Sequence, residues 1–152
     1  MALYFVRHGK AGQRGSWDGP DVLRPLSKSG RAQAQAFASW LVNEPIERVL
    51  TSPYTRCVQT VQPLADKLGL VLEITELLSE GAAFEPVIDL LMTLPEPSVL
   101  CSHGDVIPDT IEALLRRGTV LEGQADWRKG STWVLIREGV EITRTYTVPP
   151  SA

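Results

Sequence analysis

The chain has only two histidines, and the sequence places both in the same way. His8 follows the apolar run Leu-Tyr-Phe-Val and Arg7, His103 follows Val-Leu-Cys-Ser, and a glycine comes directly after each histidine. A neutral imidazole can serve as a nucleophile or as a proton carrier. If both runs are strands of a parallel sheet, the two rings meet at its carboxyl edge, where such sheets bind ligands. The alternative is that both histidines are structural and satisfied by backbone hydrogen bonds.

The positions of two arginines indicate that the site binds a phosphate group. Arg7 stands at a strand end, where an unpaired charge is costly to bury. Arg56 follows Ser52-Pro53, which predicts a helix capped by Ser52, so Arg56 would lie near a first turn whose dipole disfavours a cation. A bound anion would explain both positions, whereas a solvated surface charge is the alternative for Arg56. The sequence has no Gly-rich Walker loop and no acidic cluster with metal-ligand spacing, so we expect protein cations to neutralise the phosphate, with no metal and no cofactor.

The segments that must position these residues alternate between strand-like and helix-like runs. We expect buried strands at 3–6, 48–51, 70–74 and 98–101, and helices at 27–42, from 53 to Gly69, at 86–94 and around 107–115. Two further strands, 132–137 and 140–148, are joined by a hairpin turn at Glu138-Gly139. This order predicts one domain over residues 1–152. Its fold class is a three-layer α/β/α sandwich around a mostly parallel sheet with a late antiparallel element.

The composition and the two long loops limit the possible partners and indicate where a substrate would bind. The 152 residues are 43% hydrophobic and 22% charged with a net charge of -3, which is typical of a globular domain and disfavours nucleic acid as a partner. No run approaches the length that spans a bilayer, and no secretion signal is recognisable, so we expect no membrane partner and a cytoplasmic protein. Cys57 and Cys101 are read as buried hydrophobes. Two long loops, 9–24 and 118–130, are candidates for substrate recognition.

The motifs as a set resemble those of the histidine phosphatase (phosphoglycerate mutase-like) superfamily. Arg7-His8-Gly9 resembles the family's first signature, and Ser102-His103-Gly104 its third. The segment from Thr51 to Thr60, with Ser52-Pro53, Arg56 and Gln59-Thr60, is similar to the second. Arg24-Pro25-Leu26-Ser27, with Gly30 and Gln33, matches the start of the family's first helix. The short length most resembles SixA-type phosphohistidine phosphatases, and the segment 128–135 is also similar to histidine phosphatase domains fused behind Nudix hydrolase domains.

The resemblance implies a role for each matching residue. His8 would attack phosphorus and become phosphohistidine, which water then hydrolyses. Arg7, Arg56 and His103 would bind the phosphoryl oxygens, with Gly104 beside them, in a phosphoglycerate mutase-like fold. A carboxylate after the third strand would be the general acid. Glu80 is the best positional match, while Glu76 and Glu85 compete with it.

These features predict a metal-independent phosphatase acting on a phosphohistidine protein or a small phosphomonoester. A phosphatase for a small metabolite or a nucleotide is the alternative within the same class. A mutase is disfavoured, because the chain lacks insertions that could shield the intermediate from water. A phosphate- or phosphoprotein-binding module without turnover is the alternative from another class, although the complete set of His8, Arg7, Arg56 and His103 disfavours it.

Overall fold

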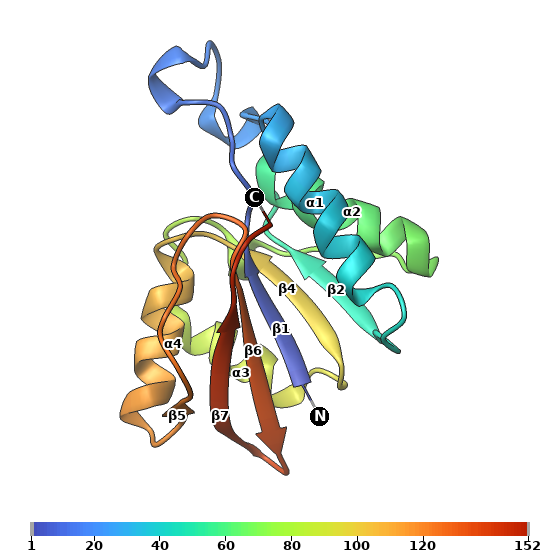
Figure 1. The fold of residues 1–152 in the computed structure, drawn as a ribbon. Coiled ribbons are helices and arrows are strands. Elements are labelled where there is room, and N and C mark those ends of the chain that lie inside the picture. The colour runs from blue at the N-terminus through green and yellow to red at the C-terminus, as the bar shows by residue number, and fades with distance from the viewer. Residues whose placement is uncertain (1, 152) are drawn as a thin grey trace.

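A computed structural model describes residues 2–151. Its centre is a seven-stranded sheet with strand order β3-β2-β4-β1-β6-β7-β5 (Figure 1). The strands are β1 (Ala2–Arg7), β2 (Arg48–Thr51), β3 (Leu72–Ile74), β4 (Ser98–Ser102), β5 (Val120–Leu121), β6 (Thr132–Glu138) and β7 (Glu141–Val148). Strands β1 to β4 run parallel to one another, β6 is antiparallel to β1, β7 is antiparallel to β6, and β5 is parallel to β7. The expected mixed sheet with a late antiparallel element is therefore confirmed.

Four α-helices cover the two faces of this sheet. They are α1 (Lys28–Leu41), α2 (Thr55–Leu68), α3 (Phe84–Thr93) and α4 (Val106–Arg116). Helices α1 and α2 pack together on one face, where Leu41 and Leu64 meet strand residues such as Val99. Helices α3 and α4 cover the other face, over a core that includes Phe5 and Trp133. The strands of the parallel half carry apolar side chains to both cores, which explains their nearly continuous hydrophobic runs.

Most predicted boundaries agree with the structure. Ser27 caps α1 by accepting a hydrogen bond from the Gly30 amide at 3.2 Å. Gly69 ends α2 in the left-handed conformation, and Gly139 turns between β6 and β7 with a φ of 65°. Strand β3 is shorter than expected, α3 starts two residues earlier, and the two-residue strand β5 was not predicted. A strand of two residues is too short to show a periodic hydrophobic pattern in the sequence.

The prediction that Ser52 caps α2 is wrong. The helix begins at Thr55, and its N-cap is Tyr54, whose side chain makes no capping bond. The Ser52 hydroxyl accepts a hydrogen bond from the Tyr54 amide at 3.2 Å and contacts the His103 ring instead. Ser52 and Pro53 therefore lie in the turn before the helix. The Ser52 hydroxyl contacts His103 and does not cap α2. Arg56 still lies in the first turn of α2.

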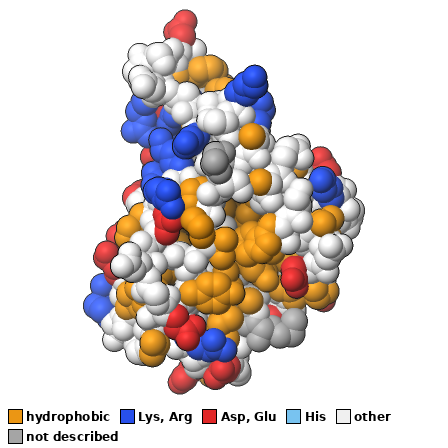
Figure 2. Space-filling model, viewed as in Figure 1, with side chains coloured by type: hydrophobic (Ala, Val, Ile, Leu, Met, Phe, Trp, Pro, Cys, Tyr) orange, Lys and Arg blue, Asp and Glu red, His pale blue; other side chains and the backbone are white. Residues whose placement is uncertain are grey.

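One face of the sheet is only partly covered by α1 and α2. In Figure 1 the two helices lie over β2 and β4 and leave β6 and β7 open on that side. Figure 2 shows hydrophobic side chains gathered in the middle of this view and Lys and Arg side chains gathered above them. Trp40 and Tyr146 remain 41% and 38% exposed. Within residues 2–151, no helix is long and apolar enough to cross a membrane.

Candidate active site

Hydrogen bonds of the backbone hold His8 at the carboxyl end of β1. Its amide donates to the Ser102 carbonyl of β4 at 3.1 Å, and its carbonyl accepts from the Gly130 amide at 3.0 Å. The next amide, of Gly9, donates to the Thr60 hydroxyl of α2 at 2.9 Å. The histidine is thus fixed between β4, the turn before β6 and α2, so little freedom is left to its backbone. Such rigidity is what a residue attacking one atom in line requires.

The His8 ring is set up as a neutral nucleophile. Its Nδ1 lies 2.8 Å from the Gly9 carbonyl oxygen, which can only accept, so Nδ1 carries the proton and Nε2 keeps its lone pair. The pKa of His8 is lowered to about 3, mainly by burial; the bond to Gly9 opposes this shift, and the nearby His103, Arg56 and Arg7 contribute to it. Nε2 is therefore free and unprotonated at neutral pH.

His103 stands beside this nucleophile with the opposite ring nitrogen engaged. The two imidazoles are T-shaped, with centroids 5.5 Å apart. The Ser52 hydroxyl lies 2.8 Å and the Cys57 thiol 3.5 Å from His103 Nε2, and both can donate to this nitrogen. We assign the ring proton to Nδ1 on this basis; Nδ1 is buried and has no hydrogen-bond partner among the described residues. A buried donor without a partner is costly, unless a ligand oxygen satisfies it.

Arg7 and Arg56 also carry a buried donor without a partner in the described part of the chain. Arg7 donates from Nη1 to the Trp127 carbonyl at 2.7 Å, and Arg56 donates from Nη1 to the Asp21 carbonyl at 3.0 Å. In both side chains, Nε is buried and has no partner within residues 2–151. Burial lowers the pKa of Arg7, and the carboxylate of Asp105 opposes that shift. The three residues that carry these unpaired donors, Arg7, Arg56 and His103, line one pocket with His8.

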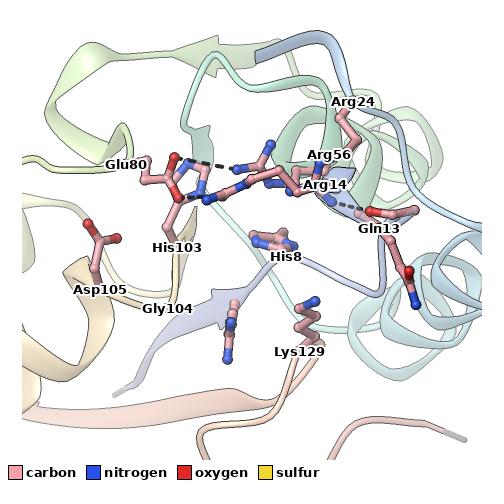
Figure 3. A pocket seen from close by; sticks show the side chains of 13 residues that line it. His8, Gln13, Arg14, Arg24, Arg56, Glu80, His103, Gly104, Asp105 and Lys129 are labelled. Carbon is pink, nitrogen blue, oxygen red and sulfur yellow. Dashed lines mark hydrogen bonds and ion pairs between the residues drawn. The ribbon is translucent and has the colours of Figure 1, made fainter. Parts of the chain in front are cut away.

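Among the three candidate acids, only Glu80 lines that pocket. One of its oxygens accepts from Arg14 at 3.2 Å, and the other lies 3.7 Å from Arg56, as Figure 3 shows. Glu76 instead accepts from the Ser79 hydroxyl, and Glu85 lies in the first turn of α3. The structure thus places Glu80 beside the predicted phosphate site and keeps both competitors out of its wall.

Asp105 is a second carboxylate in the pocket wall, and sequence reasoning did not single it out. Its two oxygens accept from the amides of Gly81 and Val106, at 2.7 and 2.9 Å. It therefore caps α4 and ties down the turn that carries Glu80, which gives it a structural task. The aspartate after His103-Gly104 could have suggested the helix cap.

Loop 9–24 supplies further residues that the sequence did not identify individually. Asp21 accepts from Arg24 Nε at 2.9 Å and from Arg56 Nη2 at 3.1 Å. Partial burial opposes its ionisation, but these two arginines outweigh that effect and lower the pKa of Asp21. Arg24 also donates to the Gly12 carbonyl and so fastens the loop over the pocket. The length of the loop was the signal available, but not which side chains turn inward.

Lys129 closes the pocket from the other long loop. Figure 3 shows its side chain rising toward His8, opposite Glu80 and Arg56. The cavity has a volume of about 480 Å³, enough for a phosphoryl group and part of its leaving group. All five residues predicted for the site, together with Gly104, line it: His8, Arg7, Arg56, His103 and Glu80. Within residues 2–151, no group of three or more His, Cys, Asp or Glu side chains is arranged to hold a metal ion.

Comparisons with known proteins agree with this arrangement. The family model of the histidine phosphatase superfamily (branch 1) matches residues 3–85. An 8-oxo-(d)GTP phosphatase of Mycolicibacterium smegmatis is 37% identical over 155 residues, which cover 97% of this chain and 48% of that protein. The phosphohistidine phosphatase SixA of Escherichia coli is 36% identical over 72 residues, which cover 46% of this chain and 43% of that protein. The chain thus spans about half the length of these relatives.

Solved structures share the fold. The protein histidine phosphatase SixA complexed with tungstate matches with a TM-score of 0.77 at 22% identity, over 100% of this chain and 97% of that one. A mycobacterial glucosyl-3-phosphoglycerate phosphatase matches with a TM-score of 0.70 at 21% identity, over 96% of both chains. The sheet, its two helical layers and the edge that carries the pocket are therefore an architecture found in other phosphatases.

Proposed function

Since this chain belongs to the histidine phosphatase superfamily, we propose that it is a metal-independent phosphatase whose His8 becomes transiently phosphorylated. The observation that carries the proposal is the set of unpaired buried donors around a neutral imidazole. Arg7 Nε, Arg56 Nε and His103 Nδ1 have no partner among the described residues, and each can donate to an oxygen of one phosphoryl group. A bound phosphate would satisfy all three.

The catalytic cycle follows from this geometry in two steps. In the first, His8 Nε2 attacks phosphorus, the bond to the leaving oxygen breaks, and that oxygen departs with the electron pair. In the second, a water oxygen attacks the phosphohistidine, the N–P bond breaks, and inorganic phosphate leaves. Charge on the phosphoryl oxygens is stabilised in both steps by Arg7, Arg56 and His103. Glu80 is the carboxyl group best placed to protonate a poor leaving group.

We propose phosphohistidine proteins or small phosphomonoesters as the substrate class; the name of the relative SixA supports the first of these. The relative from Mycolicibacterium smegmatis favours a second candidate, because its name assigns it a nucleotide substrate and it matches 97% of this chain. That relative is about twice as long, so its nucleotide activity is here a hypothesis for this chain. A pocket that is open to solvent and lined by cations suits either group of substrates.

A trapping experiment tests the nucleophile. Wild-type protein mixed with ³²P-labelled substrate and quenched in alkali should carry label on a peptide containing His8, because phosphohistidine survives base. In His8→Asn the amide can still donate to the Gly9 carbonyl, so the fold is kept while the nucleophile is lost. We expect no label and no turnover in this variant. Label at another residue, or substantial activity in His8→Asn, would show that the nucleophile is wrongly assigned.

The oxygen-binding residues are tested by truncation. His103→Ala and Arg56→Ala should each lower kcat by about 10²–10³, the usual cost of losing one donor that stabilises a transition state. Lys67→Ala, at the exposed end of α2, is the control for substitution of a cation on the same helix as Arg56 and should leave the rate unchanged. Losses below about tenfold in both site variants would mean that a different group binds the phosphoryl oxygens.

A further inference from the structure

Lys129 is a cation at the catalytic pocket that the two-step reaction does not use. It lines the same cavity as His8, Arg7 and Arg56, and its side chain points toward His8 (Figure 3). Every other cation that lines this cavity has an identified partner: Arg14 and Arg56 bind carboxylates, Arg24 binds Asp21, and Arg7 binds a carbonyl. For Lys129, no ion pair or side-chain hydrogen bond is found with the described residues.

Neighbouring positive charges disfavour the protonated form of Lys129. Burial lowers the pKa of Lys129, and the positive charges of Arg7, Arg24, Arg56 and Arg14 lower it further. The Lys129 side chain is exposed, so solvent screens this repulsion, and an anion bound beside it would offset the repulsion.

A single phosphoryl group does not account for Lys129. The unpaired Nε groups of Arg7 and Arg56 and the Nδ1 of His103 already provide three donors for the phosphoryl oxygens beside His8. The ammonium group of Lys129 is therefore available to bind additional negative charge beside the transferred group.

A second cavity begins where Lys129 stands. This cavity has a volume of about 560 Å³ and shares Lys129 and Ala11 with the catalytic pocket. Lys10, Ser27, Ser29 and Arg128 are among its other lining residues, and it contains no carboxylate among its lining residues within 2–151. The space next to the reacting phosphoryl group thus continues into a groove that two further cations line, Lys10 and Arg128, of which Arg128 pairs with Asp126.

We propose that Lys129 binds a second phosphate group, so that the preferred substrate ends in a diphosphate and the bond cleaved is a phosphoanhydride. This inference rests on the proposed function, because it uses the same nucleophile and the same phosphoryl site. The remainder of such a substrate, for example the nucleoside of a nucleoside triphosphate, lies in the groove beyond Lys129.

The reaction is balanced without any further reagent. His8 Nε2 bonds to the terminal phosphorus, and the bond from that phosphorus to the bridging oxygen breaks. The electron pair stays on the bridging oxygen, which becomes part of the leaving phosphate, and Lys129 stabilises the charge that develops there. Water then hydrolyses the phosphohistidine to inorganic phosphate. A phosphate is a good leaving group, so this reaction has little need of a general acid.

The test compares two leaving groups in the full chain, with EDTA present. Rates are measured with adenosine triphosphate and with para-nitrophenyl phosphate for wild type, Lys129→Met and the control Lys28→Met, whose lysine lines neither cavity. Lys129→Met should lower kcat/KM for the triphosphate by about 10–100-fold, the cost of one lost hydrogen bond to a charged group. For the aryl phosphate the change should stay within about twofold, and Lys28→Met should affect neither substrate.

A binding measurement gives a readout apart from turnover. In the His8→Asn background, calorimetry should show imidodiphosphate binding more tightly than inorganic phosphate, and Lys129→Met should remove that advantage.

Equal losses on both substrates would overturn the inference, because Lys129 would then bind the transferred phosphoryl group. No loss on either substrate would overturn it as well. Hydrolysis of the aryl phosphate but not of the triphosphate by wild type would leave the proposed function standing and reject the diphosphate. Absence of turnover with every substrate would instead reject the proposed function.

Discussion

The guanidinium of Arg7 lies directly against the backbone of Gly104. A Cβ added at residue 104 would lie only 2.5 Å from Cζ and from Nη2 of Arg7, well inside van der Waals contact. The missing side chain thus creates the space in which the arginine sits. This contact joins the first and the third signature motif. It explains why the residue after His103 is a glycine.

Gly104→Ala should therefore act on Arg7. The added methyl group pushes the guanidinium away from the phosphoryl position, and we expect kcat/KM to fall by about 10²-fold. Thermal unfolding should change little, because the displaced group is a side chain at a cavity. Gly12→Ala is the matched control, since Gly12 lines the same cavity and its added Cβ would meet nothing within 4 Å. Equal activity losses in both variants would contradict this reading of residue 104.

The low pKa of His8 predicts a specific dependence of stability on pH. In the unfolded chain His8 takes up a proton as the pH falls through about 6.5, whereas in the folded protein it does so only near pH 3. Between these values the unfolded state binds more protons, so acid favours unfolding by up to about 1.4 kcal/mol per pH unit from this residue. The contribution is fully present above pH 6.5 and is lost toward pH 3.

Denaturant unfolding of wild type and His8→Asn from pH 7.5 to pH 4 measures this effect. We expect the wild type to lose stability faster than the variant as the pH falls, since the asparagine does not titrate. Parallel curves would mean that His8 has an ordinary pKa in the folded protein. Single-turnover phosphorylation of wild type should also stay nearly constant down to about pH 4.5, because His8 remains neutral there.

Glu80 offers a test that separates a general acid from a structural carboxylate. If it is the acid, Glu80→Gln should slow an alkyl phosphate by about 10²–10⁴ and barely affect an aryl phosphate or a phosphohistidine, whose leaving groups need less help. Steady-state rates on the three substrates decide the matter. A uniform loss would indicate that Glu80 acts through its contacts with Arg14 and Arg56. Glu76→Gln, which changes a carboxylate outside the pocket, is the control.

Metal independence is tested with chelators and with an oxyanion. Activity should survive exhaustive treatment with EDTA, because the charge at phosphorus is neutralised by arginine and histidine side chains. Vanadate should inhibit in competition with substrate, since it adopts the five-coordinate geometry of the transition state beside His8. Loss of activity in EDTA that Mg²⁺ or Zn²⁺ restores would contradict the proposed mechanism.

The sequence predicted the residues that are tied to strand ends. His8, Arg7 and His103 follow buried apolar runs, and a strand fixes where the next residue must be, so their meeting could be expected. Arg56 could be predicted because it follows a helix start at the same edge. The helical motif residues Gln59 and Thr60 proved to be structural, since they hold the amides of Leu26 and Gly9.

Residues on the long loops could not be placed in this way. Arg14 and Lys129 reach the pocket, and Asp21 reaches Arg56, through backbone turns that no periodicity reveals, and many charged residues on such loops face solvent. Ser52 was misread for a related reason. A serine before a proline predicts a cap from local sequence alone, whereas its hydroxyl is used by a histidine 51 residues later. Long-range partners are the information that a single sequence lacks.

The register of β1 against β4 sets the scale of the whole site. Arg7 pairs with Ser102, so His8 and His103 each stand one residue beyond the last paired position. The distance between the parallel strands β1 and β4 therefore sets the separation of the two rings. A shift by one residue would turn one ring to the opposite face of the sheet. New substrates can consequently be explored by lengthening the two loops, while an insertion in either strand would destroy the chemistry at once.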